Sequence, residues 1–216
     1  MLRCGYLLND DPLIQKAKRP IEYAVTHPAE NGRLGPQHIG ELWPHAVFFR
    51  ALMAEHSASG DRRILQALQR HYLEGTTPEQ HAGDGRDICN VEEICWLYGQ
   101  TGDRRLIEYA EEAYSRYCQG GSPVSPDYLL SDARNGSECH GVFYSELIKL
   151  PAIVYMHTGD RGLLEASING FNKLDRDHML VDGIPSCNEG LAGKAPGNCH
   201  ETCVARSPRI FPLEHV

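Results

Sequence analysis

The sequence has no long hydrophobic run and no concentration of positive charge. No apolar stretch approaches the roughly 20 residues that a membrane-spanning helix needs, so we expect no membrane partner. The net charge is −8 with neutral histidines, and the basic residues form no patch, which argues against a nucleic-acid partner. The N-terminal stretch lacks the features of a secretory signal, so the compartment is open, with the cytoplasm as the default.

Strand-like patterns are also scarce, and the cysteines follow neither of two common arrangements. The chain contains 8 cysteines, but it is long for a small disulfide-stapled domain and has no export signal. No C-x2-C pair is followed by a second pair, as a zinc finger requires. Cys89 and Cys95 fall within apolar helical patterns and are expected to be buried. We therefore expect neither a disulfide scaffold nor a zinc finger.

One short pattern recurs along the chain. Its copies are SGDRRILQAL from Ser59, TGDRRLIEYA from Thr101 and TGDRGLLEAS from Thr158, with a looser copy, LNDDPLIQKA, from Leu8. Each copy has an aspartate, a favoured N-cap, before apolar residues spaced like one face of a helix. Another helical pattern precedes each of the three full copies. The sequence thus predicts a repeated unit of helix, Gly-Asp turn and helix.

These units predict an all-α protein built from antiparallel helical hairpins. Repeats about 40 to 60 residues apart are typical of stacked hairpins, and short connections make neighbouring helices antiparallel. Two architectures fit: an open α-solenoid that binds other proteins, and an (α/α)6 barrel, which is a ring of six hairpins. Long loops carrying His, Asp, Glu, Asn and Trp favour the barrel of an enzyme. Three or four hairpins do not close such a ring, so we expect a partial barrel.

The densest set of reactive side chains lies in SCNEGLAGKAPGNCHETC, residues 186–203. Its last residues bring together a thiol, an imidazole and a carboxylate, which are ligand types that zinc prefers. Glu201 and Cys203 are the candidate metal ligands, and Glu189, in a polar segment, is the candidate acid or base. On spacing alone, an ordinary loop with unligated cysteines and a solvated glutamate remains the alternative.

Three further residues are candidates for substrate binding. His140 lies at a loop-to-helix junction, where a histidine otherwise serves as a cap or as part of the core. Trp43 and His45 lie at the start of a helical pattern, with Pro44 near its first turn. These two side chains either line a sugar-binding rim or pack in the interior.

Several short motifs follow one another in the second half of the chain. They are His140-Gly141, Leu150-Pro151, Thr158-Gly159-Asp160, the loop from Asp182-Gly183 through Gly193, and Glu201-Thr202-Cys203. Together with GRLGPQ and WPHAVFFRALMAEHSASGD upstream, they resemble the catalytic domain of the β-L-arabinofuranosidase-type glycoside hydrolases, a family long described as a domain of unknown function. The similarity runs in order over residues 1 to about 205.

The resemblance implies a fold, a cofactor and residue roles. Members of this family have an (α/α)6 barrel followed by β-sandwich modules, and they hydrolyse L-arabinofuranosides with retention, using zinc and a cysteine nucleophile. By this match Glu201 and Cys203 bind zinc, Glu189 is the acid/base, and His140 contacts the carbohydrate. A zinc-bound thiolate in place of the usual second carboxylate is chemically coherent, because zinc stabilises deprotonated sulfur.

The sequence also departs from the family pattern. The family's remaining two cysteine ligands, one of them the nucleophile, lie far downstream of the position of Cys203, and Cys187 and Cys199 are not family ligand positions. We therefore expect residues 1–205 to form part of a catalytic domain and residues 206–216 to form a divergent, disordered tail. The expected product is a weakly active or inactive fragment. The alternative is a non-catalytic α-helical repeat protein that serves as a binding scaffold.

Overall fold

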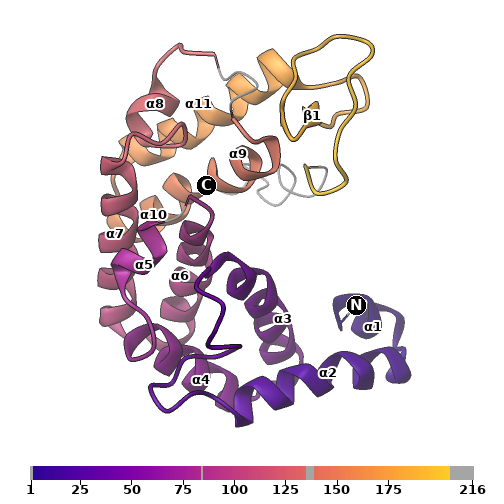
Figure 1. Ribbon diagram of the computed structural model, residues 1–216, viewed down its shortest axis with the longest axis vertical. Coiled ribbons are helices and arrows are strands. Elements are labelled where there is room, and N and C mark those ends of the chain that lie inside the picture. The colour runs from indigo at the N-terminus through magenta and orange to yellow at the C-terminus, as the bar shows by residue number, and fades with distance from the viewer. Residues whose placement is uncertain (1, 84, 135–138, 205–216) are drawn as a thin grey trace. The chain divides into compact units, whose positions relative to one another are not determined.

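The computed structural model describes residues 2–83, 85–134 and 139–204, and most of them are helical (Figure 1). The prediction of an all-α fold is therefore confirmed. In the described part of the chain, the strands form one antiparallel pair of two residues each. The tail predicted for residues 206–216 lies outside the described residues.

The chain divides into two compact units, Met1–Arg116 and Tyr117–Val216, and the boundary lies inside α7 (Arg104–Gln119). The first unit holds α1 (Leu2–Leu8), α2 (Asp11–Thr26), α3 (Trp43–Ser59), α4 (Arg62–Leu73), α5 (Pro78–Gly83), the 3-10 helix η1 (Asp87–Cys89) and α6 (Asn90–Thr101). The second unit holds α8 (Pro126–Leu130), α9 (Gly141–Leu147), α10 (Leu150–Thr158), α11 (Arg161–His178), β1 (Cys187–Asn188) and β2 (Gly190–Leu191).

The three predicted Gly-Asp turns are confirmed. Gly60, Gly102 and Gly159 end α3, α6 and α10 in the left-handed conformation, with φ of 71°, 69° and 72°. Glycine adopts this conformation without a steric penalty, which is why it terminates helices so often. The aspartate after each glycine accepts a backbone N–H two residues further on and thereby caps the next helix.

The looser copy near the N-terminus forms the same turn with a different residue. Asn9 takes the place of the glycine and adopts a φ of 52°, which asparagine tolerates better than most side chains. Asp10 then caps α2 by accepting the backbone N–H of Leu13 at 2.9 Å. The predicted fourth helical pair is therefore present as α1 and α2.

The two helices of the last hairpin differ in burial. Residues 150–154 of α10 are buried without interruption, so neighbouring elements cover this helix on several sides. On α11, buried residues such as Leu164 and Leu174 alternate with exposed ones such as Glu165. Both α8 and α10 lie against α11 (Figure 1). This hairpin thus pairs a covered helix with an amphipathic one.

Each unit has its own interior. In the first unit Phe49, Leu68, Tyr72 and Ile94 come from α3, α4 and α6 and are fully buried, each 0% exposed. In the second unit the buried Lys173 of α11 donates to the carbonyl oxygens of Tyr128 and Ser131 at 2.9 and 3.0 Å. These bonds satisfy carbonyls at the end of α8, which a helix leaves without intrahelical partners.

No helix in the described ranges combines the length and the apolar character that crossing a membrane requires.

Candidate functional site

The stretch 186–203 folds around a small hairpin with Glu189 at its tip. Cys187 pairs with Leu191 and Asn188 with Gly190, so Glu189 alone separates the inner pair. Glu189 has a φ of 62°, in the left-handed region that non-glycine residues enter at a cost of roughly 1 kcal/mol or more. Contacts with neighbouring residues must therefore hold the backbone of Glu189 in this conformation.

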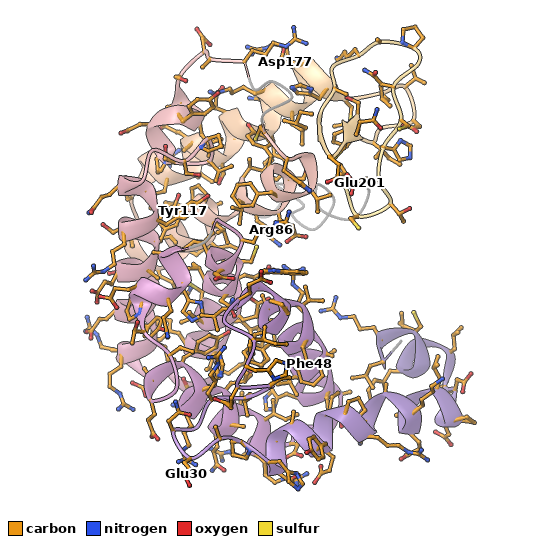
Figure 2. All side chains as sticks on the ribbon, in the orientation of Figure 1. Glu30, Phe48, Arg86, Tyr117, Asp177 and Glu201 are labelled. Carbon is orange, nitrogen blue, oxygen red and sulfur yellow. The ribbon has the colours of Figure 1, made fainter. Side chains whose placement is uncertain are left out.

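The backbone of Glu189 is held on both sides. Its N–H donates to Oε1 of Glu201 at 3.1 Å, and its carbonyl oxygen accepts the N–H of Gly141 at 2.8 Å. Glu201 lies beside β1 in Figure 2, twelve residues further along the chain. The carboxylate that the sequence marked as a metal ligand therefore also fixes the residue marked as the acid/base.

His140 faces the side chain of Glu189. It is the N-cap of α9, and its Nδ1 accepts the N–H of Phe143 at 3.3 Å. An Nδ1 that accepts carries no proton, so the neutral ring carries its proton on Nε2. Nε2 lies 3.2 Å from Oε2 of Glu189, and the two side chains are 29% and 84% exposed. The cap thus determines which ring nitrogen meets the carboxylate.

Three of the four residues to which the resemblance assigns roles lie together. Single ligand atoms of His140, Glu189 and Glu201 all lie within 4.8 Å of one another. Imidazole nitrogen and carboxylate oxygen are donors that zinc accepts, so this cluster fits a metal in donor type. Cys203 is exposed and does not belong to the cluster. Its role as a zinc ligand stays a prediction.

Cys187 is a contact of the site that the sequence did not assign. Its side chain is buried, and Sγ lies 3.2 Å from Oε1 of Glu201 and 3.3 Å from the carbonyl oxygen of Glu189. Burial and the neighbouring Glu201 carboxylate raise the pKa of Cys187 to about 11, so the sulfur is a neutral thiol that donates. The contact with Glu201 depends on the path of the intervening loop, which no spacing rule specifies.

The loop between the two glutamates is tied to its surroundings. The N–H of Cys187 donates to the carbonyl of Cys199 at 3.0 Å, and the N–H of Gly193 donates to Nδ1 of the buried His178, also at 3.0 Å. The side-chain amide of Asn198 donates to the carbonyl of Gly193 at 3.1 Å. Cys187 and Cys199 form no disulfide, so hydrogen bonds hold this loop.

Trp43, in the first unit, begins α3. Its backbone N–H and that of Leu42 both donate to Oδ1 of the buried Asp87, at 2.7 and 2.8 Å. The indole Nε1 donates to Oε2 of Glu41 at 3.1 Å, and the guanidinium of Arg86 lies 5.8 Å from the ring centre. The ring is half-buried, and its predicted contact with a sugar stays a prediction.

His45 lies in the interior of the first unit. It is 6% exposed, its Nε2 donates to the carbonyl of Leu34 at 2.8 Å, and its ring packs on those of His71 and Phe49. Burial lowers the pKa of His45, so the ring is neutral. Its predicted substrate contact stays a prediction, and the ring is engaged in the packing that was the alternative.

No known protein family matches this chain in a comparison of sequences, and no curated protein matches it either. The resemblance to the arabinofuranosidase-type hydrolases therefore remains a hypothesis drawn from short motifs.

Proposed function

We propose that the second unit carries the acid/base and part of the metal site of a retaining glycoside hydrolase that acts on L-arabinofuranosides with zinc and cysteine. The observation that carries the proposal is the Glu189 carboxylate, 84% exposed and 3.2 Å from Nε2 of His140. A general acid must reach the bond it cleaves, and an exposed carboxylate in a fixed orientation is suited to that task.

Glu189 serves as acid and then as base in this proposal. In a retaining glycosidase the carboxylic acid first protonates the leaving oxygen, and the carboxylate then removes a proton from water. His140 places Nε2 beside the carboxylate, at 3.2 Å, and Glu201 holds the backbone of Glu189.

Glu201 and Cys203 would hold zinc, as the resemblance implies. When bound, the ion stabilises a thiolate at neutral pH, which a cysteine nucleophile requires. The imidazole and carboxylate donors that meet at Glu201 support the assignment of Glu201, and that of Cys203 rests on the resemblance alone.

We further propose that the hairpins within residues 1–205 belong to a partial (α/α)6 barrel. In such a barrel the inner helix of each hairpin is covered and the outer helix is amphipathic. The contrast between α10 and α11 supports this arrangement. The resemblance puts the attacking cysteine beyond the position of Cys203, and no residue of this chain matches it. We therefore expect very low hydrolytic activity from these 216 residues alone.

The test supplies a nucleophile from solution. Azide attacks C1 of phenyl β-L-arabinofuranoside, the bond from C1 to the phenolic oxygen breaks, and Glu189 gives its proton to that oxygen. The product, α-L-arabinofuranosyl azide, is inverted and is measured by chromatography, with a chelator present so that metal does not affect the result. Glu189→Gln should lower the azide-dependent rate about 100-fold, as expected for loss of a general acid.

Two controls make the result specific. Glu165→Gln removes an exposed glutamate of α11 and should leave the rate unchanged. With 2,4-dinitrophenolate, a leaving group that needs no proton, Glu189→Gln should match the unmodified chain. A helical-repeat scaffold, the alternative, forms no glycosyl azide. Absence of the azide product, or equal rates with and without Glu189 on the phenyl glycoside, contradicts the proposed function.

A further inference from the structure

We propose that His178 is a positioning residue for Glu189, because it holds both ends of the hairpin that carries this candidate acid. His178 is the last residue of α11 and is 2% exposed. Figure 1 shows the end of α11 beside the loop that contains β1. The role of Glu189 as an acid rests on the proposed function. The hold on the hairpin does not, and the resemblance assigns His178 no role.

Two hydrogen bonds join His178 to the two arms of the hairpin. Its carbonyl oxygen accepts the N–H of Ser186, directly before β1, at 2.8 Å. Its Nδ1 accepts the N–H of Gly193, which follows β2, at 3.0 Å. Oγ of Ser186 also donates to the carbonyl oxygen of Gly193, and Ser186 is 0% exposed. Buried hydrogen bonds that meet at His178 therefore close the base of the hairpin.

The conformation at the tip of the hairpin depends on this base. Glu189 has a left-handed backbone, and the bonds to Oε1 of Glu201 and from the N–H of Gly141 hold it there. If the base opened, the two arms would separate and the strained tip would relax. The carboxylate would then leave its place beside Nε2 of His140. A displacement of about 1 Å at a reacting group can lower a rate about 100-fold, even when the substituted residue touches no substrate.

The contribution of the His178 ring to this hold is its acceptor Nδ1, and two replacements separate that acceptor from packing. Asparagine places Oδ1 near the position of Nδ1 and can accept the N–H of Gly193, although it fills less space. Leucine fills more of the space but offers no acceptor. If the ring served packing alone, leucine would be the better substitute, whereas a residue that holds the hairpin is better replaced by asparagine.

The azide reaction of the full chain, run with chelator, provides the first measurement. His178→Leu should slow the reaction of the phenyl glycoside about tenfold and change that of the 2,4-dinitrophenyl glycoside by less than about twofold, because only the former needs a proton from Glu189. His178→Asn should keep both rates within about twofold. The control His157→Leu removes a half-buried histidine from the last turn of α10 and should also keep both rates.

Amide hydrogen exchange provides a second measurement, which requires no activity. The N–H groups of Glu189 and Gly141 both form hydrogen bonds at the tip. His178→Leu should speed their exchange about tenfold or more and leave that of Ile153, within α10, unchanged. Equal acceleration at Ile153 would mean that the substitution loosens the whole unit, which would overturn the inference. Should His178→Leu not fold, the unmodified chain decides, because rapid exchange of the Gly193 N–H is incompatible with the bond to Nδ1.

Three further results would overturn the inference. They are an equal loss of rate with both glycosides in His178→Leu, an asparagine variant as slow as the leucine variant, and unchanged exchange at Glu189 and Gly141 in His178→Leu. If the unmodified chain forms no glycosyl azide, the proposed function fails. Hydrogen exchange then decides by itself whether His178 holds Glu189 in place.

Discussion

Three histidines of the first unit differ from His140 of the second unit in their access to solvent and in their partners. In the first unit His45, His71 and His81 are buried among aromatic rings, and burial lowers the pKa of all three, that of His81 to about 4. In the second unit His140 is partly exposed, and its Nε2 lies 3.2 Å from the exposed carboxylate of Glu189. Access to solvent and the partner of each ring nitrogen, rather than residue type, separate these interior rings from the ring that lies beside Glu189.

His45 and His71 of the first unit both form hydrogen bonds with the backbone of Leu34. Nε2 of His45 donates to the carbonyl of Leu34, while Nδ1 of His71 accepts the N–H of the same residue at 3.0 Å. Each ring is thereby set as a single neutral tautomer. A proton added to His71 at Nδ1 would remove the acceptor that holds Leu34, so the core resists protonation.

Lowering the pH should have the largest effect, because it destabilises the unit that buries neutral histidines. Above pH 6.5 the three buried histidines are neutral in the folded and in the unfolded chain. Below pH 6.5 they bind protons in the unfolded chain but stay neutral in the folded unit. Stability is therefore full above pH 6.5 and falls as the pH is lowered, by at most about 6 kcal/mol at pH 5 for three such groups. The measurement is urea unfolding followed by tryptophan fluorescence, since Trp43 and Trp96 both lie in the first unit.

A matched pair of variants sharpens this result. His38→Ala removes an exposed histidine and should leave the pH dependence of the free energy of unfolding unchanged. His71→Gln removes one buried histidine and should make the free energy of unfolding depend less on pH. A free energy of unfolding that is constant between pH 7.5 and 5 is incompatible with neutral buried rings in the folded unit.

Removing the aromatic support of the buried histidines is expected to have the next largest effect. Phe49 is 0% exposed and meets the rings of His45, His71 and Tyr72 edge-on. Phe49→Ala should lower the free energy of unfolding by about 3 to 5 kcal/mol, the usual cost of emptying such a site. The neighbouring half-buried Phe48, labelled in Figure 2, provides the control, and Phe48→Ala should cost clearly less in the same urea experiment. Equal losses would contradict the assignment of Phe49 to the centre of the core.

The smallest effect separates the two tasks of His140. His140→Ala removes the cap of α9 and should cost about 1 kcal/mol in thermal unfolding. His140→Asn retains an oxygen that can accept the N–H of Phe143, so it should cost only a few tenths of that value. Both variants lack Nε2 and should slow the azide reaction of the phenyl glycoside alike. If the asparagine variant keeps the full azide rate, His140 acts as a cap alone.

The sequence predicted the elements that depend on local chemistry. Gly60, Gly102 and Gly159 mark helix ends because glycine tolerates a left-handed backbone, and the aspartates after them mark helix starts. The short α8 was missed, although Ser125 followed by Pro126 is a recognisable start: Ser125 accepts the N–H of Tyr128, and proline suits the first turn.

The rest of the site depends on contacts that local patterns do not encode. The meeting of Cys187 with Glu201 requires a particular path for the twelve residues after Asn188, and that path is set by bonds such as the one from Gly193 to His178. His45 is buried beside the segment that contains Leu34, and local patterns do not show that this segment reaches the core. Sequence analysis named His140, Glu189 and Glu201, but the tautomer that joins the first two follows only from the cap on α9.

The left-handed backbone of Glu189 also bears on how position 189 responds to selection. Glycine there would relieve a strain of about 1 kcal/mol, so Glu189→Gly should melt at a higher temperature than the unmodified chain. A library of variants at this position, sorted only for survival of heat or protease, should therefore enrich glycine and asparagine and discard glutamate. The same library sorted for the azide reaction should return glutamate, so the identity of residue 189 would record which pressure had acted.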